Sequence, residues 1–203
     1  MCSSDLAGCA TEAAAEADTE EVFTIGSKNL FPPELFDENL VVSVGKPETE
    51  AKEQPIAFPH ERHVKVLGMD CQYCHSGVRK GLHAGVPATQ VCMGCHNMID
   101  TKDRPELDKL KDYAAKGEAI PWVRVHDLPD FVYFSHKRHV LGGVNCQECH
   151  GLVQDMTVAQ RVAPLNMGWC LDCHAQHDKI DENYGTQAEL RRAELKDCWT
   201  CHK

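Results

Sequence analysis

The sequence predicts a mainly α-helical chain with little regular secondary structure, and three observations support this. The pattern Cys-x-x-Cys-His occurs five times within 203 residues. Ten of the twelve cysteines belong to these five copies. Hydrophobic residues make up 42% of the chain but aromatic residues only 6%, which is sparse material for an ordinary core. We therefore expect short helices and loops that wrap around five covalently bound groups.

The five copies are numbered here as motifs I to V in chain order. They are Cys71-Cys74-His75, Cys92-Cys95-His96, Cys146-Cys149-His150, Cys170-Cys173-His174 and Cys198-Cys201-His202. This pattern is typical of c-type haem attachment, in which two thiols add across the porphyrin vinyl groups and the adjacent histidine ligates the iron. The motifs therefore predict five covalently bound haem c, with the five motif histidines as proximal ligands.

Two other uses of cysteine were weighed against haem. Paired Cys-x-x-Cys knuckles also hold zinc, but zinc does not require a histidine directly after each second cysteine. A disulfide framework does not require the fixed spacing either. The pattern favours haem over both alternatives.

Seven further histidines are candidates for the second axial position of each iron, because low-spin electron-transfer haems take a second strong ligand, His or Met. The best candidates are the pairs His60/His63 and His136/His139. Histidines three residues apart share one face of a helical turn, so each pair is expected to reach two different haems.

His126 is the preferred fifth distal ligand, because its apolar flank and Asp127 suit a buried, oriented imidazole. His83 and Met156 are the alternates, and Met156 would give one His/Met haem. His177 lies in a polar stretch and is expected to be exposed to solvent. Met167 is interpreted as a packing residue.

The order of motifs predicts the domain organisation. Residues 1–6 resemble a translated sequencing adapter and are interpreted as non-native, and residues 7–54 as an acidic, disordered tether followed by an extended docking arm. A Phe-x-His-x-x-His element precedes two motifs at Phe58 and again at Phe134, which indicates duplication of a dihaem module. We expect a dihaem module over 55–125 and a trihaem module over 126–203.

Two helices are expected as packing elements. One spans 104–116, capped by Asp103, with Pro105 in its first turn and Gly117 at its end. The other opens at a capping box formed by Thr186 and Glu189.

Charge and targeting signals bound the partners and the location. The net charge of −10 disfavours nucleic acid as a partner. Covalent haem attachment in bacteria takes place outside the cytoplasmic membrane, which predicts the periplasmic side. The sequence contains no run of about 20 apolar residues. Leu6-Ala7-Gly8-Cys9 fits a lipobox, so Cys9 is a candidate lipidation site; otherwise a missing N-terminal segment would supply the anchor.

The Phe-x-His-x-x-His element followed by Cys-x-x-Cys-His resembles class III multihaem cytochromes. The resemblance implies a class III-like fold, in which the first histidine of each element ligates the next haem in sequence. It thus implies pairing of His60 with His75 and of His136 with His150, while His63 and His139 serve other haems.

The segments 120–136 and 163–170, together with the five motifs, resemble the pentahaem cytochrome c subunit of bacterial alternative complex III. The resemblance implies an electron-transfer subunit of a quinol-oxidising respiratory complex, without a substrate site of its own. It also implies iron–sulfur and membrane subunits as partners, and a periplasmic cytochrome or an oxidase as electron acceptor. The alternatives are a freestanding multihaem carrier and a haem subunit of another quinone-reactive complex.

Overall fold

The structure is a computed structural model that describes residues 22–24, 41–43 and 51–203. Residues 1–6, Cys9 and most of the predicted tether and arm lie outside this part. Two short strands, β1 (Val22–Thr24) and β2 (Val41–Ser43), pair antiparallel with Phe23 opposite Val42. The remainder consists of short helices and loops, which confirms the predicted fold class.

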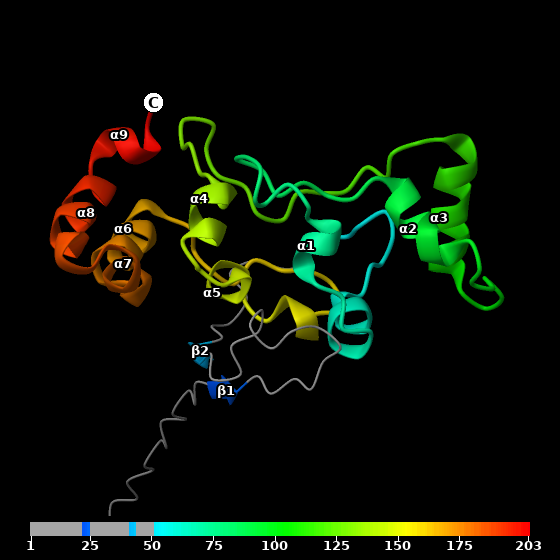
Figure 1. The fold of residues 1–203 in the computed structure, drawn as a ribbon. Coiled ribbons are helices and arrows are strands. Elements are labelled where there is room, and N and C mark those ends of the chain that lie inside the picture. The colour runs from blue at the N-terminus through cyan, green and yellow to red at the C-terminus, as the bar shows by residue number, and fades with distance from the viewer. Residues whose placement is uncertain (1–21, 25–40, 44–50) are drawn as a thin grey trace, which may run out of the picture.

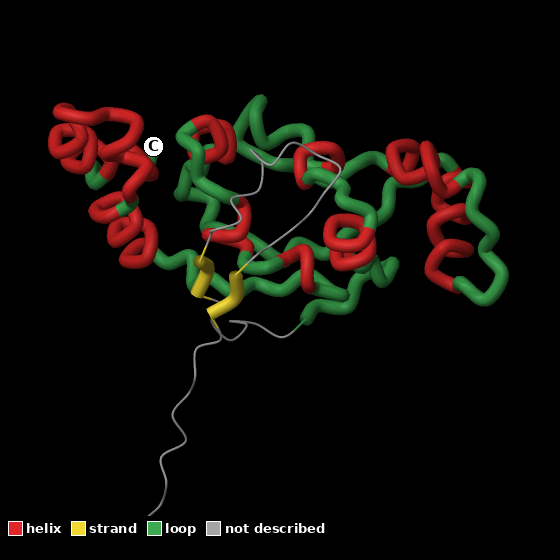
Figure 2. The backbone as a smooth tube through the Cα atoms, turned by 60° about the horizontal axis from the view of Figure 1, so that its bottom comes forward, coloured by secondary structure: helices red, strands yellow, loops and turns green. Residues whose placement is uncertain are grey.

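The helices are distributed along an elongated body (Figures 1 and 2). The first half contains the π-helical turn η2 (Glu61–Val66), α1 (Cys71–Cys74), α2 (Thr89–His96) and α3 (Pro105–Lys116). The second contains α4 (His136–Leu141), α5 (Cys146–His150), η3 (Val153–Asp155), α6 (Met167–Gln176), α7 (Asp178–Tyr184), η4 (Gly185–Gln187), α8 (Ala188–Leu195) and α9 (Cys198–Cys201). The pair α2 and α3 occupies one end of the body, and α6 to α9 occupy the other.

A small apolar cluster fixes the α2–α3 end. Ile56, Leu110 and Ile120 are buried there, and Leu107 and Trp122 pack against them. The expected helix over 104–116 begins one residue later, at Pro105, and ends at Gly117, whose φ of 67° only glycine adopts easily. Asp103 was wrongly expected to cap it: Arg104 occupies the N-cap position and no side chain caps the helix.

The capping box predicted at Thr186 is also wrong. Residues 185–187 form the 3-10 turn η4, and α8 begins at Ala188 without a side-chain cap. The chain leaves α7 at Gly185, and the tighter turn that follows takes the place of the expected first helical turn. No helix among the described residues is long and apolar enough to cross a bilayer. The boundary between 55–125 and 126–203 stays a prediction.

Candidate functional site: five attachment motifs and their facing histidines

Each attachment motif lies on a helix, although three of these helices have only four or five residues. Helices this short are marginal without support. Asp70 accepts a hydrogen bond from the Gln72 amide at 2.6 Å, and Asp197 accepts one from the Trp199 amide at 2.8 Å. Such N-caps contribute about 1 kcal/mol each, and they hold both cysteines of a motif on one helical turn.

Motif III has a fuller N-cap, which the sequence analysis missed. The Asn145 side chain and Glu148 form a reciprocal capping box, with the Glu148 carboxylate 2.7 Å from the Asn145 amide. The spacing Asn-x-x-Glu is the sequence signature of this arrangement and would have found it.

Backbone carbonyls orient most of the motif histidines. The Nδ1 atoms of His75, His174 and His202 donate to the carbonyls of Gly85, Leu195 and Phe131, at 2.7, 3.1 and 3.2 Å. Because Nδ1 carries the proton in this tautomer, Nε2 keeps its lone pair for a metal. His96 differs, since its Nδ1 is buried without a partner.

The candidate distal histidines are oriented by the same device. His63, His136 and His139 donate from Nδ1 to the carbonyls of Pro59, Leu82 and Ser135, at 2.9, 2.7 and 2.9 Å. Phe58 stacks on His63 at 4.3 Å between ring centres, and Phe134 stacks on His139 at 4.4 Å. The phenylalanines of the repeated element thus hold the imidazoles in place, a role that the sequence analysis did not assign.

Three distal candidates face proximal histidines at nearly equal spacing. The ring centres are 6.1 Å apart for His63 and His96, 6.3 Å for His136 and His150, and 6.1 Å for His139 and His174. With metal–nitrogen bonds of about 2 Å and about 1 Å from nitrogen to ring centre, a metal between two imidazoles puts the centres about 6 Å apart. The facing pairs therefore fit a six-coordinate haem iron.

His60 lies beside motif I. Burial, together with the nearby His75 and His63, lowers the pKa of His60 to about 4. Its Nδ1 is buried without a hydrogen-bond partner. A neutral, buried imidazole close to a motif histidine suits a metal ligand. Motif I thus has two histidines close together, as motifs II, III and IV do.

His126, the preferred fifth ligand, lies in a different setting. Its ring meets His150 edge-on at 4.4 Å, and its Nε2 is buried without a partner. Burial lowers its pKa, and Arg161 and His136 add to this effect. Since His150 already faces His136, the structure brings His126 to motif III as a neighbour of an existing pair.

The alternates are also placed. His83 is exposed in the loop after motif I. Met156 is half-buried, and its carbonyl accepts from the Glu61 amide at 3.2 Å, beside the turn that carries His63. Met167 is 67% exposed at the start of α6. The five distal assignments stay predictions.

The expected exposure of His177 is wrong. Its side chain is only 18% exposed, because the junction of α6 and α7 places it against motif III. Its Nε2 donates to Glu148 at 2.6 Å, and its Nδ1 accepts from the Lys179 amide at 3.1 Å. Both ring nitrogens are engaged, so His177 is a structural residue in this fold.

The motif cysteines approach one another between motifs. The side chains of Cys71 and Cys146, the first cysteines of motifs I and III, lie close together. Among the described residues, no group of three or more His, Cys, Asp or Glu side chains is placed to hold a bare metal ion.

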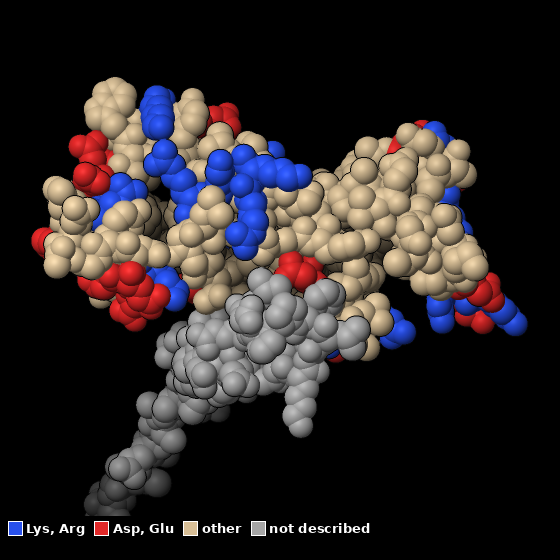
Figure 3. Space-filling model, in the orientation of Figure 1, with Lys and Arg blue, Asp and Glu red and all other residues tan. Residues whose placement is uncertain are grey.

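A hollow of about 380 Å³ adjoins motif V. Arg138 of α4, Arg191 of α8 and Lys203 line it with Trp199. Lys and Arg gather over the region of α4 in Figure 3, although the whole chain carries a net charge of −10. Basic side chains therefore cluster on this face near α4, although Glu194 and Asp197 also line the hollow.

Two families match the chain. Residues 38–116 match the class III cytochrome c family, and residues 132–203 match the family of cytochrome c7 and related cytochrome c. The chain is also similar to the multihaem cytochrome c subunit of menaquinone reductase from Nitratidesulfovibrio vulgaris. The two are 31% identical over 172 residues, which cover 75% of this chain and 78% of the relative.

Proposed function

Since the chain belongs to the multihaem cytochrome c family, we propose that it is the electron-relaying haem subunit of a membrane-bound, quinone-linked respiratory complex. Covalently bound haem c is the cofactor of this family, and we propose five, one for each motif. Motif cysteines would form the thioethers and motif histidines would be the proximal ligands. When bound, haem supplies a one-electron iron couple.

The observation that carries the proposal is the set of facing imidazoles. His63, His136 and His139 stand opposite motif histidines at one common spacing. Hydrogen bonds to carbonyls orient all three of these rings, and stacked phenylalanines hold two of them. The rings are therefore already oriented before the iron changes its oxidation state. Rings held in this way keep the same geometry in both oxidation states, which favours electron transfer over ligand exchange.

The same arrangement argues against a substrate site in motifs II to IV. Facing histidines would occupy the position that catalytic haems leave open. We therefore propose an electron-transfer subunit rather than an enzyme in its own right. The parent complex would carry the quinone chemistry.

The link to quinone has two sources of support. The segments 120–136 and 163–170 resemble the pentahaem subunit of alternative complex III, which would place the chain in a quinol-oxidising complex. The relative from Nitratidesulfovibrio is a subunit of a menaquinone reductase, which favours a second candidate in which electrons run toward the quinone. The haem relay is common to both.

Partners and location follow from this role. We propose iron–sulfur and membrane subunits on one side and a periplasmic cytochrome or oxidase on the other. The periplasmic face of the cytoplasmic membrane is the proposed location, because haem c is attached there. A preceding segment or a lipid on Cys9 would hold the chain to the membrane.

The first test is a haem-stained native gel of mildly solubilised membranes, followed by mass spectrometry of the stained band. We expect the chain in a large complex with iron–sulfur and polytopic subunits. Migration near its own mass would contradict the proposal and favour a freestanding carrier.

The direction of flow needs a second measurement on the isolated complex. A menaquinol analogue should reduce the haems rapidly if the complex oxidises quinol. Rapid oxidation of pre-reduced haems by the quinone, without rapid reduction by the quinol, would favour the menaquinone-reducing candidate.

A further inference from the structure

We propose that the chain arranges its five motifs in space in the order II, I, III, IV, V, so that motif I is internal and motif II is terminal. The inference rests on the proposed relay function, which makes the spatial order matter. This order differs from the sequence order only in that motifs I and II exchange places, so that motif I meets the second half of the chain. Four links between neighbouring motifs carry it, and each is visible in the contacts of named residues.

The first link joins motifs II and I. His60 and His63 lie three residues apart, and the first is beside His75 while the second faces His96. The side chains of Cys92 and Cys74 also lie near each other. One turn, η2, thus serves both motifs.

The second link joins motif I to motif III and bypasses motif II. The side chains of Cys71 and Cys146, the first cysteines of these two motifs, lie near each other. The loop after motif I also contacts α4. The Leu82 carbonyl accepts a hydrogen bond from the His136 amide at 3.2 Å, and the Gly81 carbonyl accepts one from the Lys137 amide at 3.1 Å. The His136 ring donates to the same Leu82 carbonyl at 2.7 Å.

The third and fourth links follow the sequence. Motifs III and IV are joined by α4, whose His136 and His139 face His150 and His174. Motifs IV and V are joined by the proximity of the Cys170 and Cys201 side chains. The Leu195 carbonyl just before motif V orients the His174 ring.

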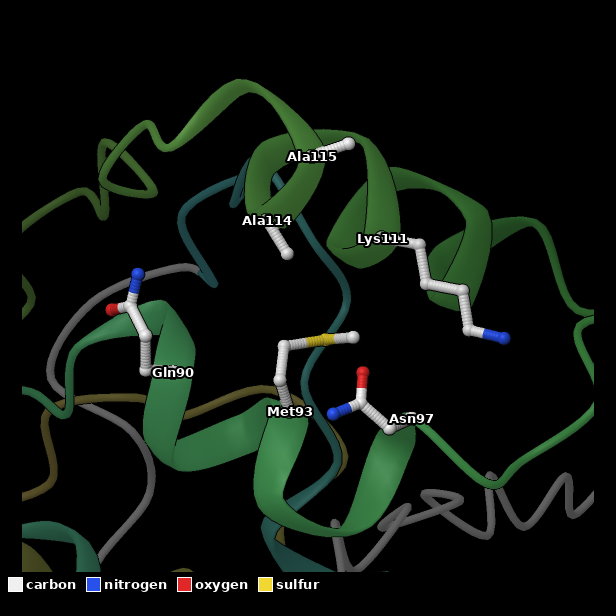
Figure 4. A pocket seen from close by; sticks show the side chains of 6 residues that line it. All are labelled: Gln90, Met93, Asn97, Lys111, Ala114 and Ala115. Carbon is white, nitrogen blue, oxygen red and sulfur yellow. The ribbon is translucent and has the colours of Figure 1, made fainter.

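Motif II is surrounded by its own half of the chain. Its helix α2 packs on α3, and Cys92 and Met93 contact the cluster around Leu110. Figure 4 shows Met93 reaching from α2 into the space between the two helices, a hollow of about 500 Å³. Figure 1 accordingly places α2 and α3 at one end, α1 next, then α5, and α6 and α9 at the other end.

The consequence is a relay with a defined interior. A partner at the α9 end and a partner at the α2 end would exchange electrons with opposite ends of the relay. Trp199, in the middle of motif V, is 73% exposed and marks one of these termini. Motif I, although first in the sequence, would be the crossing point between the two halves.

The test compares removal of motif I with removal of motif II in the otherwise complete holoprotein. A ruthenium photoreductant is attached to Lys196→Cys, near motif V, with Cys2 and Cys9 changed to serine. In Cys92→Ala/Cys95→Ala we expect all four remaining haems to be reduced in the fast phase. In Cys71→Ala/Cys74→Ala we expect one quarter of the amplitude to become at least tenfold slower, because motif II is cut off.

An arrangement in sequence order predicts the reverse pattern, with the slow quarter in the variant that lacks motif II. That result would overturn the inference. If a variant fails to fold, a second measurement on the unaltered holoprotein tests the same order. In its fully reduced, diamagnetic state, nuclear Overhauser contacts between haem substituents are expected between motifs I and III.

Contacts between motifs II and III, with none between I and III, would also overturn the order. These contacts report position alone, so they hold or fail whether or not the protein enters a respiratory complex. Failure of the proposed function and failure of the proposed order are therefore distinguishable.

Discussion

The two repeated elements, one at Phe58 and one at Phe134, build almost the same ligand geometry. The first histidine of each meets its phenylalanine edge-on at 4.9 Å, and the second stacks on it at 4.3 or 4.4 Å. The second histidine also donates to the carbonyl four residues earlier at 2.9 Å in both copies. Both copies thus make the same local contacts, which orient an imidazole.

The first histidines of the two elements are held differently. The Nδ1 atom of His136 donates to Leu82 of the other half, whereas that of His60 is buried without a partner. The first copy turns as the π-helix η2 and the second as the α-helix α4. The comparison teaches that local sequence sets the geometry of the second histidine of each element, while the contact between halves makes the first histidines unequal.

The largest expected effect comes from removing the stacked rings. Phe58→Ala and Phe134→Ala should each destabilise the holoprotein by about 2–4 kcal/mol, since half-buried aromatic packing is lost. Phe58 should cost more, because it also meets Trp122 edge-on at 6.4 Å. Chemical unfolding followed by haem absorbance measures this. Tyr133→Ala, at a side chain that is 47% exposed, is the control. Equal losses at all three positions would refute the proposed role of the stacked rings.

A glycine substitution should break the second half more than the first. Gly151 has φ of 69°, and a Cβ there would lie 2.5 Å from a methyl carbon of Val162. Gly151→Ala should therefore cost about 2–3 kcal/mol, from backbone strain and overpacking combined. Gly85, with φ of 74° and open space around it, should lose only about 1 kcal/mol as Gly85→Ala. The difference in unfolding midpoint between the two variants is the measurement, and its absence would rule out the steric conflict with Val162.

Much of this comparison was accessible from the sequence. The motifs predicted the mainly α-helical fold class with little regular secondary structure, and the Phe-x-His-x-x-His repeat predicted two equivalent elements. These features are local, and local contacts such as the bond from His63 to Pro59 follow from a few neighbouring residues.

The long-range contacts were not accessible. The burial of His177 depends on a contact with Glu148, 29 residues away, and nothing in its polar neighbourhood indicates it. The proximity of Cys71 and Cys146 depends on how two halves of the chain meet. The N-cap at Asp103 failed for a different reason, since its φ of 60° places it in a turn before the helix. Helix ends are decided by such backbone details, which composition does not contain.

The Glu148 contact sharpens the difference between the halves, because motif I has Tyr73 at the corresponding position. Glu148→Ala should cost about 1–2 kcal/mol, through loss of both the capping box and the His177 bond. Glu148→Gln keeps a capping-box side chain and should lose about half as much. Tyr73→Phe, whose side chain is 58% exposed, is the matched control. If the Gln and Ala variants unfold together, the cap contributes nothing and this account fails.

The smallest expected effect separates the two halves by pH. The amide before Phe58, on Ala57, donates to the Glu106 carboxylate at 2.7 Å, whereas the corresponding amide of Tyr133 donates to the Cys201 carbonyl at 2.8 Å. A hydrogen bond from Lys109, followed by the one from Ala57, lowers the pKa of Glu106 below its usual 4.5. Its contribution is therefore complete above about pH 4.5 and is lost as the pH falls through the lowered value.

The carboxylate is largely exposed, so the loss should stay below about 1 kcal/mol. Hydrogen exchange between about pH 6 and about pH 3 should show the protection of the Ala57 amide falling with acid, while that of Tyr133 stays constant relative to intrinsic exchange. In Glu106→Gln the Ala57 amide should lose this pH dependence. A parallel acid response at Tyr133 would mean that the whole ligand-bearing fold loosens together. The two halves would then respond to acid together, although different acceptors bind the amides of Ala57 and Tyr133.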